Sequence, residues 1–438
     1  MRIRVAILAI CAASLINSTV PAAGPPIAFV GVNVVPMDRE RVLANHTVVV
    51  QDGRISAVGP ADKTTVPAGS LRVEGRGKYL MPGLAEMHGH VPAPNSPSQF
   101  IEDVLYMYVA NGVTTVRGML GHDGQLVLRE RAKKNEVVAP TLYLAGPSFN
   151  ANTPKTPEEA VRMVRAQKAA GWDLLKVHPG PTVPIYDAMA RTAKELGIRF
   201  GGHVPPAVGL LHVIASGQET IDHVDGYVEY LQDSAGRIDA ARLKEVVRKT
   251  EDAGVWIVPT MALWETLQGA LDLQTVTSYP ELKYMPPDMV EGWTTTHRNR
   301  LANPNVNVET ATRTIRHRMQ ILASLHQAGV PILLGTDAPQ QFSVPGFSIH
   351  REMPRMIEAG MKPYDVLKAG TYNVGVYFKS QDTFGTVEAG RRADLILLDA
   401  NPLDDVAHVA RRSGVMVRGM WIPEADLQSR LATIAASQ

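Results

Sequence analysis

The chain has 438 residues, of which 45% are apolar and 20% are charged, so it can bury a large core and is not a disordered chain. Its 44 basic residues nearly match its 43 acidic ones, and aromatic residues make up only 6%. This composition disfavours nucleic acid and anionic membranes as partners. At about 100 to 200 residues a domain, the length fits a few ordinary domains or one large barrel with an appendage.

The first 23 residues have the pattern of an export signal. Arg2 and Arg4 open the chain, an apolar run covers 5–16, and small residues stand near a plausible cleavage point at residue 22 or 23. The run is too short for a stable membrane anchor. We expect residues 1–23 to be removed and the protein to be exported, either to a periplasm or out of the cell. An apolar N-terminal strand or helix and a lipoprotein signal at Cys11 are the alternatives.

Cys11 is the only cysteine, and it lies inside this leader. Removal of the leader therefore leaves no disulfide framework and no thiolate chemistry. No later stretch of the sequence is apolar enough to cross a bilayer. We expect no stable membrane anchor.

Residues 24–80 are expected to form a β module. Two β-branched runs at 47–50 and 55–58 flank the pair Asp52-Gly53, which is a strong hairpin signal.

From residue 81 to about 380, short apolar runs alternate with helical stretches. Alternation at about 30 residues a unit predicts a parallel sheet, and eight such units make a (β/α)8 barrel, an α/β fold. The eight runs begin near residues 84, 114, 141, 173, 198, 221, 255 and 332. The last interval is too long for one helix, so we expect an insertion at about 262–312 on the catalytic face. It is a candidate lid or pocket wall with Trp264, Tyr284 and Trp293; a plain surface loop is the alternative.

A second β stretch occupies residues 381–438, with strand-like runs at 395–399 and 414–417. Because the two β stretches flank the barrel in the sequence, we expect them to be the two halves of one small β-sandwich.

The strongest chemical signal is a His-Gly-His motif at the end of an apolar strand. Residues i and i+2 of a strand point to the same side, so His88 and His90 face the same space, where two imidazoles can bind a metal ion. Further groups of ligand type follow the ends of later strand-like runs: Lys176, His203, His223 and Asp337. An ordinary pair of core or surface histidines is the alternative for the motif alone, and the convergence of six groups argues against it.

This series resembles the amidohydrolase superfamily over nearly the whole chain after the leader. The motifs that carry the resemblance are Met81-Pro82-Gly83-Leu84 before His88, the ligand series itself, and the run from Gly385 to Leu395. Residues 202–205 and 220–223 are most similar to the prolidase and imidazolonepropionase-like group. Glu86 departs from the pattern, since many members have Asp there. We expect Glu86 to support the ligands from behind.

The resemblance implies a centre of two Zn²⁺ ions, with other divalent metals allowed. The implied ligands are His88, His90 and Asp337 for the buried ion, His203 and His223 for the more exposed one, and Lys176 as a bridge. Lys176 would bridge as a carbamate formed with CO2, because burial near cations favours a neutral, reactive amine. A plain buried or surface lysine is the alternative.

The resemblance further implies hydrolysis of an amide C–N bond, or of a related ester bond, by a metal-bridged hydroxide with Asp337 as general base and acid. The expected substrate is a dipeptide, an N-acyl amino acid or a similar small molecule, and a homo-oligomer is possible. The alternative is a mononuclear deaminase or cyclic-amide hydrolase. Such members usually carry a carboxylate soon after the histidine of the fifth strand, and none follows His203 directly. A metal-holding protein without catalysis is a second alternative, and the intact Asp337 argues against it.

Arg117, His178 and Tyr227 are the candidate substrate-binding residues. Arg117 could meet a substrate carboxylate through two hydrogen bonds, Tyr227 could do so from the sixth strand, and His178 lies beside Lys176. For each, a packing or solvated residue is the alternative. His350 is a candidate supporting group. The other histidines are expected to be ordinary surface or packing residues: His46, His122, His212, His297, His317, His326 and His408.

Overall fold

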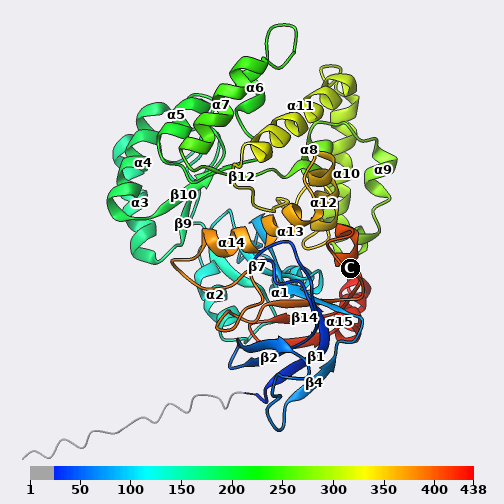
Figure 1. Ribbon diagram of the computed structural model, residues 1–438. Coiled ribbons are helices and arrows are strands. Elements are labelled where there is room, and N and C mark those ends of the chain that lie inside the picture. The colour runs from blue at the N-terminus through cyan, green and yellow to red at the C-terminus, as the bar shows by residue number, and fades with distance from the viewer. Residues whose placement is uncertain (1–23) are drawn as a thin grey trace, which may run out of the picture.

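The computed structural model describes residues 24–438, so the expected leader lies outside the described residues. Strands alternate with helices through the middle of the chain, which confirms the α/β class (Figure 1). Within residues 24–438, no helix has both the length and the apolar sequence needed to cross a membrane.

The two ends of the described chain meet in one eight-stranded sheet, at the bottom of Figure 1. The strand order is β15-β14-β13-β5-β1-β2-β3, with β4 beside β1. The strands are β1 Ile27–Val34, β2 Leu43–Gln51, β3 Arg54–Pro60, β4 Leu71–Glu74, β5 Tyr79–Pro82, β13 Leu395–Leu398, β14 Arg412–Val417 and β15 Met420–Pro423. Strand β5 pairs antiparallel with β13 and so joins the N-terminal to the C-terminal segment. The expected sandwich is not confirmed, because both segments belong to this one sheet.

The expected hairpin connects β2 and β3, which pair antiparallel. Asp52 and Gly53 at its tip have φ angles of 51° and 73°. Positive φ at both central residues is what a tight hairpin turn requires, and it explains the Asp-Gly pair.

Seven of the eight expected barrel strands form two parallel sheets. They are β6 Leu84–Gly89, β7 Val113–Gly118 and β8 Thr141–Leu144 in one sheet, and β9 Leu174–Val177, β10 Arg199–Gly202, β11 Thr220–Asp222 and β12 Trp256–Val258 in the other. A parallel bridge between Ala145 and Leu174 connects the two sheets.

The expected eighth strand near residue 332 forms no ladder of its own. Ile332 makes a single parallel bridge to Ile257 of β12, and the carbonyl of Leu334 accepts a hydrogen bond from Met87 N–H of β6 at 2.8 Å. The segment divides its few hydrogen bonds between two neighbours, and Pro331 has no N–H to donate. It nevertheless lies between β12 and β6, where the eighth strand of a barrel belongs.

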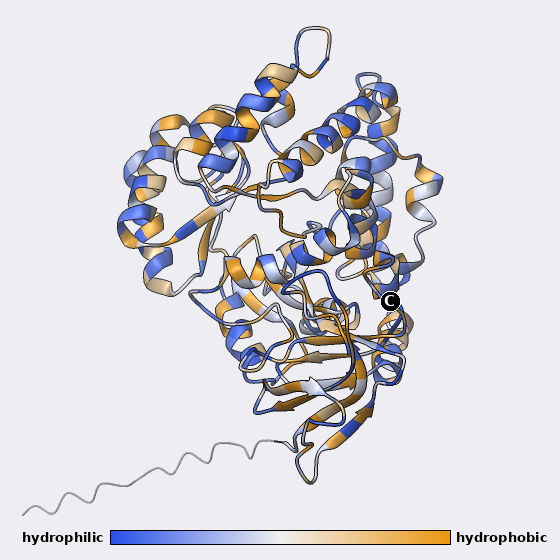
Figure 2. Ribbon diagram, viewed as in Figure 1, coloured by the Kyte–Doolittle hydropathy of each residue, from blue (hydrophilic) through white to orange (hydrophobic). Residues whose placement is uncertain are grey.

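Helices cover the parallel strands and carry both polar and apolar residues along their lengths (Figure 2). The helices are α1 Ser98–Ala110, α2 Gln125–Lys133, α3 Pro157–Ala170, α4 Val183–Leu196, α5 Leu210–Ala215, α6 Tyr227–Leu231, α7 Ala240–Asp252, α11 Val308–Gln327, α12 Ile349–Glu358, α13 Pro363–Gly370, α14 Tyr372–Tyr377 and the 3-10 helix η2 Val406–Ala410. Helix α15 Glu424–Ala436 packs instead against β14 and β15. Four more follow β12, where the insertion is expected: α8 Met261–Leu267, α9 Leu273–Thr277, the 3-10 helix η1 Pro280–Tyr284 and α10 Pro287–Ala302.

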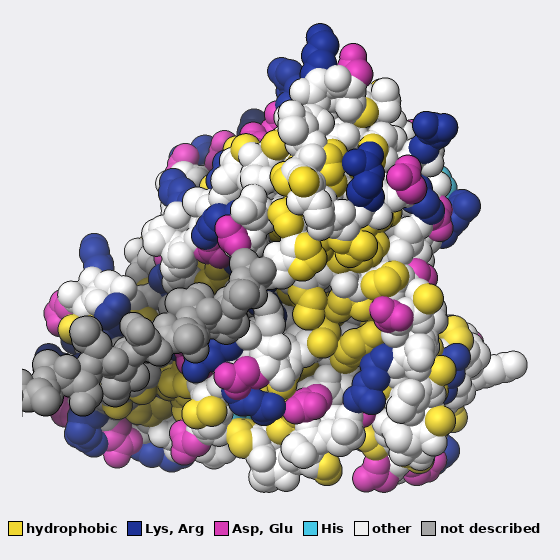
Figure 3. Space-filling model, turned by 90° about the horizontal axis from the view of Figure 1, so that it is seen from below, with side chains coloured by type: hydrophobic (Ala, Val, Ile, Leu, Met, Phe, Trp, Pro, Cys, Tyr) yellow, Lys and Arg dark blue, Asp and Glu magenta, His cyan; other side chains and the backbone are white. Residues whose placement is uncertain are grey.

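The face seen from below in Figure 3 carries charged side chains of both signs, scattered among apolar ones. No single sign of charge dominates that face, in keeping with the balanced composition of the chain.

Candidate metal centre

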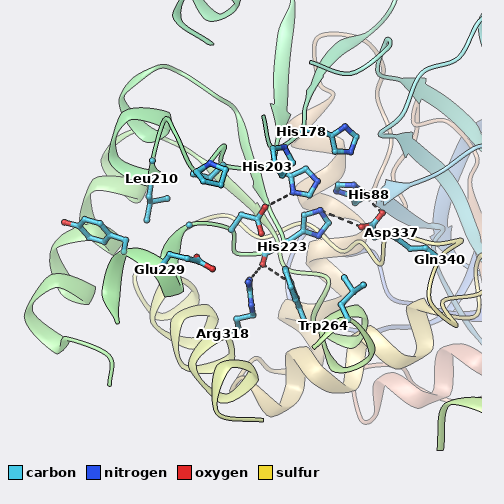
Figure 4. A pocket seen from close by; sticks show the side chains of 18 of the residues that line it. His88, His178, His203, Leu210, His223, Glu229, Trp264, Arg318, Asp337 and Gln340 are labelled. Carbon is cyan, nitrogen blue, oxygen red and sulfur yellow. Dashed lines mark hydrogen bonds and ion pairs between the residues drawn. The ribbon is translucent and has the colours of Figure 1, made fainter. Parts of the chain in front are cut away.

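Each of the six predicted ligands lies near or just after the carboxyl end of a parallel segment. His88 lies on β6 with His90 just after it, Lys176 lies on β9, His203 follows β10, and the remaining two follow β11 and residue 332. Because parallel strands end at one edge, their side chains converge there. Figure 4 shows the four labelled histidines and Asp337 grouped around one pocket.

His88, His90 and Asp337 form a compact group. One ligand-type atom from each lies within 4.8 Å of the other two. His90 Nε2 is 2.6 Å and His88 Nε2 is 3.6 Å from the same oxygen, Asp337 Oδ1. Two imidazole nitrogens and one carboxylate oxygen are a donor set that suits zinc and similar divalent ions.

Lys176 lies directly beside this group. Its side chain is fully buried, and its Nζ is 2.9 Å from His88 Nε2. Burial lowers the pKa of Lys176 to about 8, so a neutral amine is accessible near neutral pH.

His203 and His223 complete the convergence, with ring centroids 4.5 Å apart. His223 Nδ1 lies 2.8 Å from Thr260 Oγ1, and if Nδ1–H donates to that hydroxyl, Nε2 keeps a lone pair. That Nε2 is buried, has no hydrogen-bond partner in residues 24–438, and lies 3.7 Å from Asp337 Oδ2. A buried polar atom without a partner costs about 1–3 kcal/mol. A metal ion at this position would satisfy it, so the donor set fits the expected centre.

Glu86 supports the ligands from behind, as expected. Its carboxylate accepts hydrogen bonds from the backbone N–H of His88 at 2.9 Å and of Thr336 at 2.8 Å, and from the Thr336 hydroxyl at 2.6 Å. Burial raises the pKa of Glu86 to about 8. Gly335 allows this close packing, because a Cβ there would lie 2.8 Å from His88 N.

Asp222 is a supporting residue that the sequence analysis missed. Its Oδ2 lies 2.7 Å from His88 Nδ1, and a carboxylate there holds the ring with Nε2 toward the centre. The available signal was a carboxylate directly before the predicted ligand His223, at the end of a strand-like run, since a buried carboxylate seldom lacks a partner.

Arg117 is not a substrate ligand, which corrects the prediction from the sequence. It is 0% exposed and does not line the cavity. Its Nη2 donates to both oxygens of Asp222 at 3.0 and 3.1 Å, and its Nε donates to the Met87 carbonyl at 2.6 Å. Its donors are therefore engaged inside the protein.

Tyr227 is also misassigned as a substrate residue. Its side chain is fully buried, and its hydroxyl contacts Thr250 Oγ1 at 2.7 Å. Helix α6 turns Tyr227 inward, and Tyr230, three residues later, lines the cavity in its place.

His178 does line the cavity and stacks on His203, with ring centroids 5.1 Å apart. Burial lowers the pKa of His178 to about 3, so it is neutral at physiological pH and can donate or accept a hydrogen bond. His350 and the seven histidines expected to be ordinary do not line this cavity.

The centre opens into a cavity of about 830 Å³ with mostly apolar walls. Trp264 of α8 lines the cavity, which supports the expected pocket wall in the insertion. Tyr284 and Trp293 do not line it: Tyr284 stacks on Phe347 at 4.9 Å, and Trp293 packs edge-on against Phe342 at 5.9 Å. The polar lining residues that the sequence analysis missed are Asp225, Glu229, Tyr230, Arg318 and Gln340.

The family model described as "Amidohydrolase family" matches residues 79–422, which is most of the chain. Imidazolonepropionase of Fusobacterium nucleatum is 22% identical over 386 residues, or 83% of this chain and 87% of the relative. Adenine deaminase of Paracoccus denitrificans is 26% identical over 202 residues, which cover 42% of this chain and only 33% of the relative.

The solved structures that are similar in fold include the following two. Bottromycin amidohydrolase has a TM-score of 0.75 and 24% identity over 94% of this chain and 90% of that one. A Xaa-Pro dipeptidase with methionine bound in its active site has a TM-score of 0.69 and 18% identity over 91% of this chain and 100% of that one. At such identities, the likeness concerns the fold alone.

Proposed function

Because the chain belongs to the amidohydrolase family, we propose that it is a metal-dependent hydrolase that cleaves an amide C–N bond in a small substrate such as a dipeptide or an N-acyl amino acid. One observation carries the proposal: three ligand-type side chains, the buried Lys176 and the unpartnered His223 Nε2 converge at the floor of a large cavity. The proposal includes a closed (β/α)8 barrel and export after removal of residues 1–23.

The six converging residues would hold two divalent ions, Zn²⁺ in the first instance. His88, His90 and Asp337 would hold one, His203 and His223 would hold the other, and Lys176 would bridge them as a carbamate. The carbamate forms when the neutral Lys176 amine attacks CO2 and loses a proton. Bound divalent ions would polarise the scissile carbonyl and make a water molecule more acidic.

Asp337 is the group that would move the proton. Its carboxylate is 5% exposed at the floor of the cavity, with His90 on one oxygen and His223 near the other. From there it can take a proton from the attacking water and deliver it to the nitrogen of the leaving amine. His178 is placed to hydrogen-bond the substrate beside it.

A second candidate is a mononuclear deaminase or cyclic-amide hydrolase. The missing carboxylate after His203 argues against it, but Asp225 reaches His203 from the segment after β11, with Oδ2 2.7 Å from Nδ1. This carboxylate lines the cavity, where it could transfer protons in ring chemistry. The imidazolonepropionase and the adenine deaminase among the relatives favour the same reading.

An activity assay distinguishes these two candidate functions. It uses metal-loaded protein that starts at residue 24 and is prepared with bicarbonate. A panel of dipeptides and N-acyl amino acids is assayed beside adenine and cyclic amides, with Lys176→Ala and with Lys133→Ala as an exposed control. We expect linear amides to be hydrolysed and Lys176→Ala to lose more than about 100-fold in kcat/KM. Full activity of Lys176→Ala, on cyclic or deaminable substrates only, contradicts the proposal.

A further inference from the structure

Arg318 of α11 is a buried cation without a carboxylate partner in the described part of the chain. It is 2% exposed and lines the cavity. Its Nη1 donates hydrogen bonds to the backbone carbonyls of His223 and, at 3.3 Å, Val224. Its Nε has no hydrogen-bond partner, and within residues 24–438 it forms no ion pair at 4.0 Å or less.

The other deeply buried arginines differ from Arg318 in this respect. Arg117 contacts Asp222 at 3.0 Å, Arg392 contacts Asp394 at 2.7 Å, and Arg412 contacts Glu424 at 3.5 Å. Removing a guanidinium from water costs several kcal/mol unless an anion compensates. Burial lowers the pKa of Arg318 below its ordinary value, as it also does for Arg412. An anion that arrives from outside would supply the missing compensation.

Trp264 fixes the orientation of the guanidinium. Arg318 Cζ lies 3.6 Å from the centre of the Trp264 ring, and Trp264 Nε1 donates to the His223 carbonyl at 3.0 Å. Both side chains thus meet the same carbonyl, as Figure 4 shows. Nη1 is taken by that carbonyl and Nε is fully buried. Nη2, which makes no hydrogen bond within residues 24–438, is the donor left for a carboxylate.

The carboxylates nearest in the lining do not take this role. Asp225 is engaged by His203 at 2.7 Å, and Glu229 is exposed to solvent. His223 meets Arg318 through its carbonyl, while its ring belongs to the metal centre. An anion at Arg318 would therefore lie in the same cavity as the metal centre.

We propose that Arg318 binds the free carboxylate of the substrate and thereby selects dipeptides and N-acyl amino acids over neutral amides. The proposal rests on the proposed hydrolase function. It gives Arg318 the role that the sequence analysis assigned to Arg117.

The test compares acids with their matched amides. Zinc-loaded protein is given N-acetyl-L-amino acids and the corresponding carboxamides, and kcat/KM is measured for every compound hydrolysed. For compounds that are not hydrolysed, the Kd is measured by calorimetry. The variants are Arg318→Gln and Arg318→Lys, and Arg316→Gln, an exposed arginine of the same helix, is the control. Metal content and circular dichroism are recorded for each.

We expect the wild type to prefer acids over amides by about 30-fold or more. In Arg318→Gln this ratio should fall toward one, Arg318→Lys should keep part of it because it keeps the charge, and Arg316→Gln should keep all of it. Acids that bind through Arg318 without being hydrolysed would support this site while contradicting the hydrolase function.

Two results would overturn the proposal. One is a wild type that shows no preference for acids, whether in hydrolysis or in binding. The other is an equal loss for acids and amides in both Arg318 variants together with loss of metal, because Arg318 would then only position His223, whose φ of 66° is unusual for a side chain of this size.

Discussion

Two arginines lie buried beside the metal centre, and they differ in what they are paired with. Arg117 is 0% and Arg318 is 2% exposed. Burial alone would lower the pKa of Arg117, but the Asp222 carboxylate reverses that effect and raises it. Within residues 24–438, Arg318 donates hydrogen bonds only to backbone carbonyls, and burial lowers its pKa. The paired arginine therefore belongs to the frame of the site, and the unpaired one is available to a ligand.

The same contrast between paired and unpaired charges separates two sides of the site. The closed side lies inside the protein behind His88, and the open side lines the cavity. On the closed side, Arg117 and Asp222 pair with each other, and Glu86 and Asp222 both contact His88. On the open side, charged side chains line the cavity in which a substrate would bind. In this site, a charged side chain that pairs with a charge of opposite sign has a structural role. A charged side chain without such a partner is available to bind a ligand.

The largest expected effect is on stability, from Arg117→Met. This change leaves Asp222 as an unpaired buried anion and should cost about 3–5 kcal/mol in the free energy of unfolding. Arg318→Met leaves no such anion and should cost about 1 kcal/mol or less. Urea unfolding of both variants measures the difference. Equal losses would remove the distinction between the two arginines.

We expect the ionisation of Glu352 to change the free energy of unfolding by up to about 3 kcal/mol. Glu352 binds the start of α8, the helix that carries Trp264 in the cavity wall. Its carboxylate accepts hydrogen bonds from the N–H groups of Met261 and Ala262, both at 2.8 Å. Burial raises its pKa from 4.5 to about 7.

Between pH 4.5 and 7 the unfolded chain releases this proton while the folded protein keeps it, so the wild type should lose stability relative to Glu352→Gln as the pH rises. Urea unfolding from pH 4.5 to 8 measures that difference, with Glu358→Gln, an exposed residue of the same helix, as the control. A difference that does not change with pH would contradict the pKa shift.

On the closed side, Asp222→Asn should lower both metal affinity and activity. Without the carboxylate at Nδ1, His88 is a weaker and less oriented ligand, so zinc affinity and kcat/KM should each fall by about 10- to 100-fold. Zinc titration and steady-state kinetics measure the two losses. Unchanged zinc affinity would show that Asp222 serves Arg117 alone.

The smallest expected effect comes from Glu229→Gln on the open side. Glu229 is an exposed anion in the cavity wall, so its removal should lower KM for anionic substrates by only about two- to fivefold. Neutral amides should be unaffected. The effect should shrink in high salt, and an effect that persists there would contradict a purely electrostatic role.

The sequence predicted the elements whose signals are local. The strand starts follow from short apolar runs, and the Asp52-Gly53 hairpin follows from turn chemistry. The pairing of His88 with His90 follows from the two-residue alternation of a strand. Helix α15 was missed, since its sequence follows directly on strand-like runs.

Long-range pairing could not be predicted. Arg117 and Arg318 look alike in the sequence, and only the fold brings Asp222, 105 residues away, to one of them. The eighth strand was expected as a full strand, and its hydrogen bonds are instead divided between β12 and β6. Side-chain direction on α6 likewise decided between Tyr227 and Tyr230.

The central claim is that six side chains hold two metal ions bridged by Lys176, and metal content tests it most directly. Zinc per chain should be counted in protein starting at residue 24, purified with bicarbonate, for the wild type and for Lys176→Ala. We predict about two equivalents in the wild type and a clear loss in the variant. One equivalent in both proteins would contradict the bridged centre and favour mononuclear chemistry.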